Sequence, residues 1–296
     1  MSGDVPVTVF RSPRRRACEE RLLVLTAVGI EAWLVRGADA FLLEVAGADA
    51  DQAARHLRQY EAENRASPLP SPPSRVYSHA WVGCLAYAVV LLGVPWVMSN
   101  GLVRLDAFDL GELDAARVQA GQWWRAWTAL TLHLDGPHLA ANLAAGMWFG
   151  YLAARQMGSG LAWLLTVSGA AIANLAEGLL GPPEHLAVGA STTVFSALGA
   201  MSAYAWRERF AWPQRWARRW GPLVAGVILL GWTGAGGEGT DVDVVAHLGG
   251  FGVGALLGAT AALPRAQQLL GHVPQPLSGA AALASLALAW ACALLS

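Results

Sequence analysis

Hydrophobic residues dominate the chain from about residue 80 onward, where polar positions are mostly confined to the connections between apolar segments. A helix needs about 20 residues to cross a bilayer, with a range of about 17–25. Most of the segments reach this length, and the one at 221–235 is the shortest. The pattern therefore predicts an α-helical polytopic membrane protein. The seven apolar segments are Ala80–Met98, Pro137–Ala154, Gly160–Leu180, Gly189–Trp206, Gly221–Ala235, Val244–Leu263 and Gly279–Leu295.

The first 65 residues follow a different pattern, in which short β-like runs alternate with amphipathic helical stretches. Their order is β-α-β-β-α, which predicts a small soluble α+β domain over residues 1–65. Residues 66–78 follow as a linker, because four prolines among residues 66–74 favour an extended chain. The predicted elements are Val5–Phe10, Pro13–Gly29, Glu31–Val35, Ala40–Val45 and Ala50–Asn64.

Composition supports the membrane assignment. Hydrophobic residues make up 55% of the chain and charged residues only 14%, whereas soluble domains carry about 25% charged residues. The net charge of −1 gives no basic surface for nucleic acid. Three cysteines lie far apart and predict neither a disulfide framework nor a zinc site.

The basic residues, all of them arginine, are distributed unevenly. One side of the predicted membrane receives eight of them from the connecting segments, and the opposite side receives three. Positive charge accumulates on the cytoplasmic side of membrane proteins, so we expect a cytoplasmic N-terminus. The eight are Arg75, Arg155, Arg207, Arg209, Arg215, Arg218, Arg219 and Arg265, and the three are Arg104, Arg117 and Arg125.

Four polar side chains interrupt the apolar segments at one predicted depth. Counted from the arginine that ends each segment, at about 1.5 Å per residue, Asn142 and His138 lie roughly 20 and 26 Å up. Ser191 and His247 lie roughly 24 and 27 Å up by the same count. In a hydrocarbon core about 30 Å thick, all four fall in one layer near the outer surface. Polar residues inside a bilayer are costly and commonly functional.

The chemistry of these four residues is complementary. A histidine can take the proton of a serine hydroxyl and make it a nucleophile. Gly189 precedes Ser191 in a small-residue turn that aims the first N–H groups of a helix at the group under attack. His138 and Asn142 are donors suited to an oxyanion. Taken singly, each residue is more often a structural contact within or between helices, but the four together favour a catalytic site.

Four blocks of sequence resemble the rhomboid intramembrane serine proteases in order and spacing, over roughly residues 120–260. The resemblance implies a six-helix core, here residues 79–264. The last apolar segment then gives a 6+1 arrangement, with residues 265–296 as connector and seventh helix. The blocks are Trp124-Arg125, His133–Asn142, Gly189-Ala-Ser191 and Ala246–Gly254.

Residue matching to this family implies a role for each site residue. Ser191 is the expected nucleophile and His247 the expected general base, without a third acid. His138, Asn142 and the Ser191 backbone N–H form the expected oxyanion hole. Arg125 belongs to the first external loop, whose membrane-dipping hairpin is expected over Ser99–Gln122. The supporting residues are Gly189, Phe195 stacked on the catalytic histidine, Trp124, Arg125, Gly250 and Gly254.

Two positions depart from the family pattern. Thr192 stands where many rhomboids have glycine, and its side chain would crowd the oxyanion pocket or alter packing against the sixth span. Ala154-Arg155-Gln156 replaces a Glu-x-Arg sequence and removes an ion-pair network of mainly structural role. Neither change removes a reacting group.

The sequence thus predicts a serine endopeptidase that cleaves transmembrane or juxtamembrane segments of membrane proteins. Its expected partners are such substrates, the lipid bilayer and a cytoplasmic partner of the N-terminal domain, with no nucleic acid, cofactor or metal. The expected location is the bacterial inner membrane, with the site open to the periplasmic or extracellular side. The alternative is a catalytically weak or silent rhomboid-like protein that binds or chaperones membrane proteins. The presence of both Ser191 and His247 favours the protease.

Overall fold

The computed structural model describes residues 5–64, 76–100, 106–210, 216–234 and 243–296. The chain divides into two compact units, Met1–Pro70 and Ser71–Ser296, each of which is described by itself. Most of the predicted linker 66–78 lies outside the described residues, as do residues 101–105 of the predicted hairpin.

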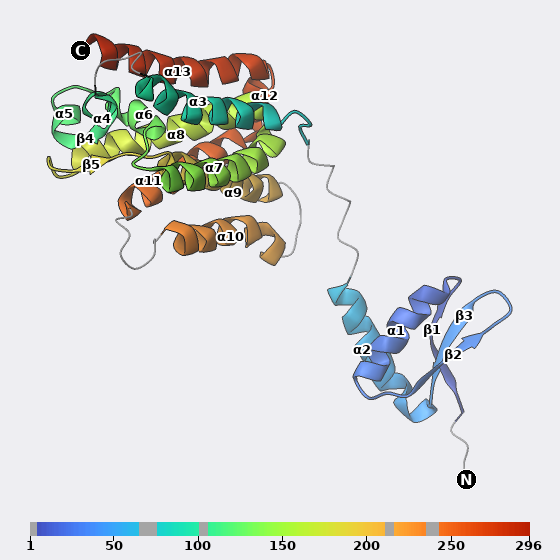
Figure 1. Ribbon diagram of the computed structural model, residues 1–296. Coiled ribbons are helices and arrows are strands. Elements are labelled where there is room, and N and C mark those ends of the chain that lie inside the picture. Colours follow the sequence, from blue (N-terminus) through green and yellow to red (C-terminus); the bar gives the residue numbers. More distant parts are fainter. Residues whose placement is uncertain (1–4, 65–75, 101–105, 211–215, 235–242) are drawn as a thin grey trace. The chain divides into compact units, whose positions relative to one another are not determined.

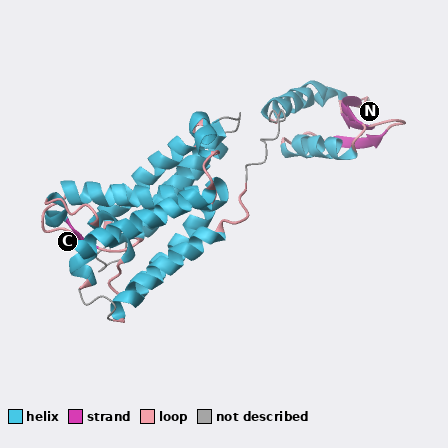
Figure 2. Cartoon of the chain, turned by 90° about the horizontal axis from the view of Figure 1, so that it is seen from above, coloured by secondary structure: helices cyan, strands magenta, loops and turns pink. Residues whose placement is uncertain are grey.

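The N-terminal unit is a three-stranded antiparallel sheet packed against two helices (Figure 2). Its middle strand is the third in sequence, and the small core includes Leu25, Leu43 and Leu57. The β-like runs and helical stretches predicted here occur in the predicted order. The elements are β1 (Val7–Ser12), α1 (Arg15–Ala27), β2 (Ala32–Arg36), β3 (Phe41–Val45), η1 (Gly47–Asp49) and α2 (Ala50–Glu63).

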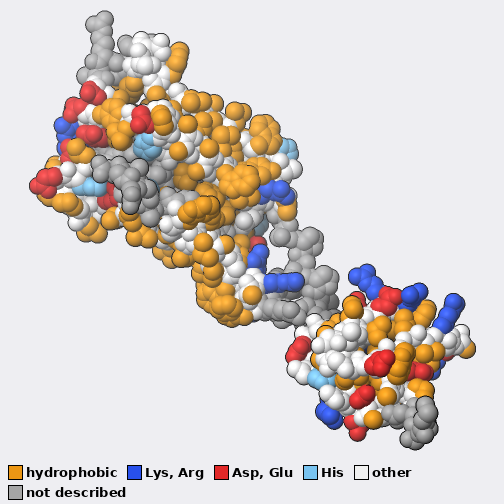
Figure 3. Space-filling model, turned by 60° about the horizontal axis from the view of Figure 1, so that its bottom comes forward, with side chains coloured by type: hydrophobic (Ala, Val, Ile, Leu, Met, Phe, Trp, Pro, Cys, Tyr) orange, Lys and Arg blue, Asp and Glu red, His pale blue; other side chains and the backbone are white. Residues whose placement is uncertain are grey.

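The second unit is helical, and each of the seven predicted apolar segments corresponds to one long helix (Figure 1). Helices α3, α8, α11 and α13 are long and apolar enough to cross a membrane. Hydrophobic side chains cover much of the surface of this unit in Figure 3. The long helices are α3 (Trp81–Ser99), α7 (Gly136–Met157), α8 (Ser159–Leu180), α9 (Ser191–Phe210), α10 (Trp216–Gly234), α11 (Val244–Ala261) and α13 (Gln275–Leu295).

Short elements between α3 and α7 gather at one end of the helical unit (Figure 1). One of them, β4, pairs in antiparallel fashion with β5, which lies just before α9. This pairing ties the loop that leads into α9 to the segment between α3 and α7. The short elements between α3 and α7 are α4 (Ala107–Gly111), β4 (Leu113–Asp114), α5 (Ala115–Gln119), α6 (Arg125–Thr128) and η2 (Ala129–Thr131). Two further short elements are β5 (Leu186–Ala187), before α9, and α12 (Pro264–Leu270), before α13.

Glycines let α9 and α11 pack backbone to backbone. A Cβ added to Gly254 would lie 2.8 Å from the carbonyl carbon and Cα of Ser196. A Cβ added to Gly258 would lie 2.7 Å from the same atoms of Ala200. Carbon atoms pack best at about 3.5–4.0 Å, so neither position has room for a side chain. These two contacts hold α11 and α9 side by side beyond their first turns.

Helix α13 packs along α8 and is fixed near both of its ends. At its start, Gln275 accepts a hydrogen bond from the Leu161 backbone N–H at 3.0 Å and donates to the Met157 carbonyl at 3.3 Å. Near its end, the indole of Trp290 donates to the Thr131 hydroxyl at 3.1 Å. These polar contacts specify how the last helix sits on the bundle, since apolar packing alone is non-directional.

Candidate active site

A strained turn leads directly into Ser191, the first residue of α9. Gly189 has a φ of 129°, a backbone conformation that residues with a side chain rarely adopt. Its N–H donates to the Ala129 carbonyl at 3.0 Å, and the next N–H, that of Ala190, donates to Nε2 of His133 at 3.3 Å. Gly189 and Ala190 are buried, whereas Ser191 is partly exposed. The turn therefore presents the serine at the end of a helix on a fixed backbone.

His138 and Asn142 lie against this turn from the first turns of α7. Asp135 caps α7 by accepting the His138 N–H at 2.6 Å. A Cβ on Gly189 would lie 2.8 Å from Cε1 and Nε2 of His138 and 3.6 Å from Nδ2 of Asn142. Glycine is thus needed here both for its backbone angle and for the approach of these two side chains.

The Asn142 amide is a buried donor facing the turn. The residue is 7% exposed, and its Nδ2 has no hydrogen-bond partner among the residues that the structure describes. Its backbone carbonyl accepts a hydrogen bond from the Tyr87 hydroxyl at 3.0 Å, which fixes this part of α7 to α3. A buried unpaired donor costs about 1–3 kcal/mol, so it marks a place where a ligand atom would be stabilised.

His247 lies in the first turn of α11 and is 7% exposed. Asp243 caps this helix by accepting the Ala246 N–H at 2.9 Å, and the His247 N–H donates to the Asp243 carbonyl at 3.1 Å. The ring of Phe195 packs on the imidazole with centroids 4.3 Å apart and planes inclined by 39°. Because Phe195 is one turn after Ser191, this contact sets the histidine beside the first turn of α9.

Thr192 faces α11. It is buried, and a Cβ on Gly250 would lie 2.6 Å from the Thr192 carbonyl oxygen and 3.0 Å from its Cγ2. Thr192 directly follows Ser191, and Gly250 lies three residues after His247, so this contact links the segments that carry Ser191 and His247. Gly250 is therefore required where the second turn of α11 meets the first turn of α9, and the Thr192 side chain packs against the helix that carries His247.

Arg125 organises the loop between α3 and α7, and Trp124 precedes it in the same segment. Arg125 is 2% exposed, and its guanidinium donates to the backbone carbonyls of Asp109 at 2.6 Å and Glu112 at 2.9 Å. Its Nε donates to the Gln122 side chain at 2.6 Å. Trp124 immediately precedes α6. The described part of the predicted hairpin is folded into α4, β4 and α5, and Arg125 holds these short elements together.

His133 was missed as a separate site residue by the sequence reasoning, although it opens the block that contains His138. Its ring meets the His138 ring edge-on, with centroids 5.1 Å apart, and its Nε2 accepts the Ala190 N–H. His133 lies in the loop before α7, where burial and the neighbouring His138 lower its pKa to about 4. A neutral His133 thus supports the turn before Ser191 at neutral pH.

A second group that sequence reasoning missed contains Glu177, His185 and Asp243, whose ligand atoms lie within 4.8 Å of one another. It involves the residue that caps the helix of His247. Among the described residues, this group has the donor set that suits a metal ion.

Comparison with known proteins accounts for the core of the helical unit. Residues 120–264 match the Rhomboid domain. The chain is 29% identical over 168 residues to rhomboid protease GluP of Bacillus subtilis (strain 168), covering 57% of this chain and 31% of that protein. It is also 29% identical over 162 residues to RHOMBOID-like protein 1 of Arabidopsis thaliana, covering 53% of this chain and 40% of the relative.

The chain thus spans 31% and 40% of the lengths of these two relatives. The matched residues include all the predicted site residues, from Trp124 to Gly254. The apolar helices and the matched domain identify an integral membrane protein. Residues 120–264 of this chain therefore carry a rhomboid domain.

Proposed function

We propose that this protein is an intramembrane serine endopeptidase that hydrolyses peptide bonds in or beside the transmembrane segments of other membrane proteins. One observation carries the proposal. The first two turns of α9 and α11 meet through Phe195 on His247 and Thr192 on Gly250, and the turn before Ser191 lies against His138 and Asn142. This arrangement supports a nucleophile, a base and an oxyanion site around one point.

Ser191 attacks the carbonyl carbon of the scissile bond, and His247 takes the hydroxyl proton as the C–O bond forms. The same imidazole then gives its proton to the leaving amine, which breaks the C–N bond and leaves an acyl-enzyme. Water, deprotonated by His247, hydrolyses the ester and restores the serine. Phe195 supports this cycle because its ring restricts the imidazole to one orientation.

The negative charge on the carbonyl oxygen is stabilised by donors on α7 and on the turn. The Asn142 amide, His138 and the Ser191 backbone N–H suit this role, and the start of α9 adds its partial positive charge. The unpaired Nδ2 of Asn142 supports the assignment, since it is a buried donor whose partner arrives with the substrate. Donors fixed in advance need no rearrangement as charge develops.

The same proposal includes a membrane arrangement. The six helices α3, α7, α8, α9, α10 and α11 form the catalytic core, and α13 adds a seventh span. The excess of arginine on one set of connections supports a bacterial inner membrane location with the N-terminus in the cytoplasm and the site open to the periplasmic or extracellular side. The N-terminal unit is then placed for a cytoplasmic partner.

Labelling by a serine-directed fluorophosphonate, together with cleavage of a membrane-anchored reporter, tests the proposal. The full chain should react and cleave, while Ser191→Ala should do neither. Ser202→Ala is the matched control, because Ser202 is a buried serine further along the same helix. It should label and cleave like the unmodified chain. If the unmodified chain neither labels nor cleaves, or if Ser191→Ala cleaves equally well, the protein is not this enzyme. A rhomboid-like binder then accounts for the fold.

A further inference from the structure

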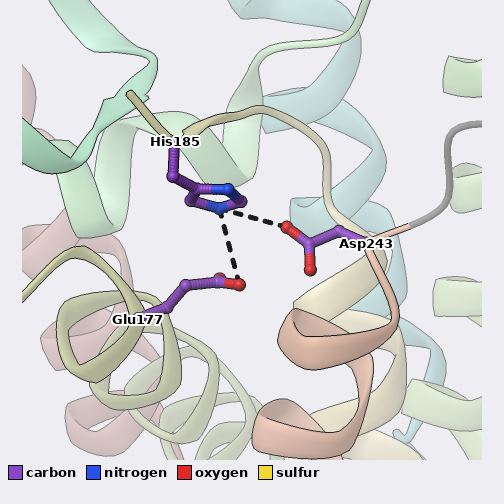
Figure 4. A group of neighbouring side chains, drawn as sticks. All are labelled: Glu177, His185 and Asp243. Carbon is purple, nitrogen blue, oxygen red and sulfur yellow. Dashed lines mark ion pairs between the residues drawn. The ribbon is translucent and has the colours of Figure 1, made fainter. Parts of the chain in front are cut away.

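Three segments that are far apart in the chain bring a histidine and two carboxylates together (Figure 4). Glu177 lies in the last turn of α8, His185 lies in the loop before β5, and Asp243 immediately precedes α11. Nε2 of His185 lies 3.5 Å from Oε1 of Glu177 and 3.3 Å from Oδ2 of Asp243. Because the three residues are spread from position 177 to position 243, their spacing carries no metal signature.

The cluster contains buried carboxylate oxygens that accept no hydrogen bond from the described residues. The Glu177 side chain is 7% exposed, and its Oε2 has no hydrogen-bond partner among the described residues. Oδ2 of Asp243 is likewise buried without a hydrogen bond from any described residue. Two carboxylates that converge in a buried place repel each other, and a cation between them relieves this cost.

The geometry points to a zinc ion bound by Glu177, His185 and Asp243. Zinc takes histidine nitrogen and carboxylate oxygen at about 2.0–2.2 Å in a tetrahedral arrangement, whose edges are then about 3.3–3.6 Å. The two distances from the imidazole, 3.5 and 3.3 Å, have this length. Calcium and magnesium prefer oxygen ligands, so the histidine argues against them. A fourth position remains for water.

His185 and Asp243 are already held by contacts outside the cluster. The His185 N–H donates to the Pro182 carbonyl at 3.0 Å, and its own carbonyl accepts the Ala115 N–H at 3.1 Å. Asp243 uses Oδ1 to cap α11 and keeps Oδ2 toward His185. Metal binding would therefore leave the helix cap in place. Ligands fixed beforehand reduce the ordering cost of binding.

The site lies on the segments that lead into both proposed catalytic residues. His185 is six residues before Ser191, and the Asp243 carbonyl accepts the N–H of His247. A zinc ion here ties the loop before α9 to the first turn of α11 and to the end of α8. Its three ligands are positioning residues, since none of them is a reacting group in the proposed mechanism. Binding itself does not depend on the proposed peptidase activity.

Metal binding to the purified full chain, stripped with EDTA and freed of any histidine tag, tests this inference. Zn²⁺ titration against a chromogenic chelator should give one ion per chain. Co²⁺ should give the intense visible bands of a tetrahedral site. Glu177→Gln, His185→Ala and Asp243→Asn should each weaken Zn²⁺ binding about tenfold or more. Asp243→Asn is informative because asparagine caps a helix about as well as aspartate.

Glu184→Gln and His272→Ala are matched controls, since both residues are exposed and lie outside the cluster. They should bind Zn²⁺ like the unmodified chain. In a Ser191→Ala background, Zn²⁺ should raise the unfolding temperature, and Asp243→Asn should remove that rise without lowering the metal-free value appreciably. The inference is overturned if the unmodified chain binds no stoichiometric Zn²⁺, or if the ligand variants bind like the controls. Either result would leave the cluster as a set of contacts between His185 and the two carboxylates.

Discussion

Replacing Gly254 by alanine tests whether the close contact between α9 and α11 positions the site. The added Cβ would lie 2.8 Å from the carbonyl carbon and Cα of Ser196. Carbon atoms pack at about 3.5 Å or more, so the helices must separate locally by roughly 0.7 Å. Overpacking of this kind costs about 1–3 kcal/mol. For a unit of this size, the unfolding temperature should fall by roughly 2–12 °C.

The same displacement should slow the proposed reaction. His247 lies two turns before Gly254 on α11, and Ser191 lies a little more than one turn before Ser196 on α9. A shift of about 1 Å between reacting groups costs about 100-fold in rate. We expect a decrease of roughly tenfold to 100-fold in cleavage of a membrane-anchored reporter. Most of this decrease should appear in kcat.

Gly252→Ala is the matched control, because it makes the same chemical change two residues away on the same helix. No described atom outside its own helix and chain neighbours would lie within 4 Å of a Cβ on Gly252. Alanine also favours a helix over glycine by about 1 kcal/mol, so the unfolding temperature should hold or rise. Thermal unfolding and reporter cleavage in the same detergent compare the two variants. If the two variants lose unfolding temperature and cleavage rate equally, the close contact at Gly254 does not position the site.

Three further predictions concern the site and its supports. Asn142→Ala should lower kcat about 100–1000-fold with little change in KM, measured by reporter cleavage, because it removes a proposed oxyanion donor; a decrease below threefold would contradict that role. Arg125→Met should make the segment between α3 and α7 susceptible to limited proteolysis, because two backbone carbonyls lose their donor; an unchanged digestion pattern would contradict this. The pKa of His133 is lowered to about 4 in the folded protein, whereas it is about 6.5 in the unfolded chain. As pH falls below about 6.5, the unfolded chain therefore takes up a proton on His133 before the folded protein does. The contribution of neutral His133 to the free energy of unfolding should be complete above about pH 6.5 and should be lost as pH falls toward 4. This loss is at most about 3 kcal/mol, and solvent screening makes it smaller. A His133→Gln variant should show a flatter dependence of unfolding temperature on pH, and equal slopes would contradict the assignment.

Much of the fold followed from local pattern. Each of the seven apolar segments corresponds to a long helix, and residues 5–64 form the expected strands and helices. The long helices are signalled by the length of each apolar segment, and the N-terminal elements by the periodicity of hydrophobic positions. Each signal is contained in about 20 consecutive residues. The four polar residues were singled out for a similar reason, since a polar side chain stands out in an apolar segment.

Contacts between distant segments could not be predicted in the same way. His133 meets the His138 ring edge-on and accepts a hydrogen bond from the Ala190 N–H. The hydrogen bond joins the loop before α7 to a turn more than fifty residues away. The Thr192 side chain was open to two interpretations, and the structure packs it against α11. Helix packing decides such contacts, because it sets which faces meet and at what distance.

The sequence by itself determined the apolar helices, the resemblance to rhomboids and the short set of polar residues that an apolar chain retains. Tertiary structure alone decided that Glu177, His185 and Asp243 converge, and that glycines bring α9 and α11 together at Thr192. The physical reason is the distance along the chain between the residues involved. Hydrophobic length and periodicity are properties of neighbouring residues, whereas a cluster of ligands exists only after packing has fixed the ends of three separate segments in space.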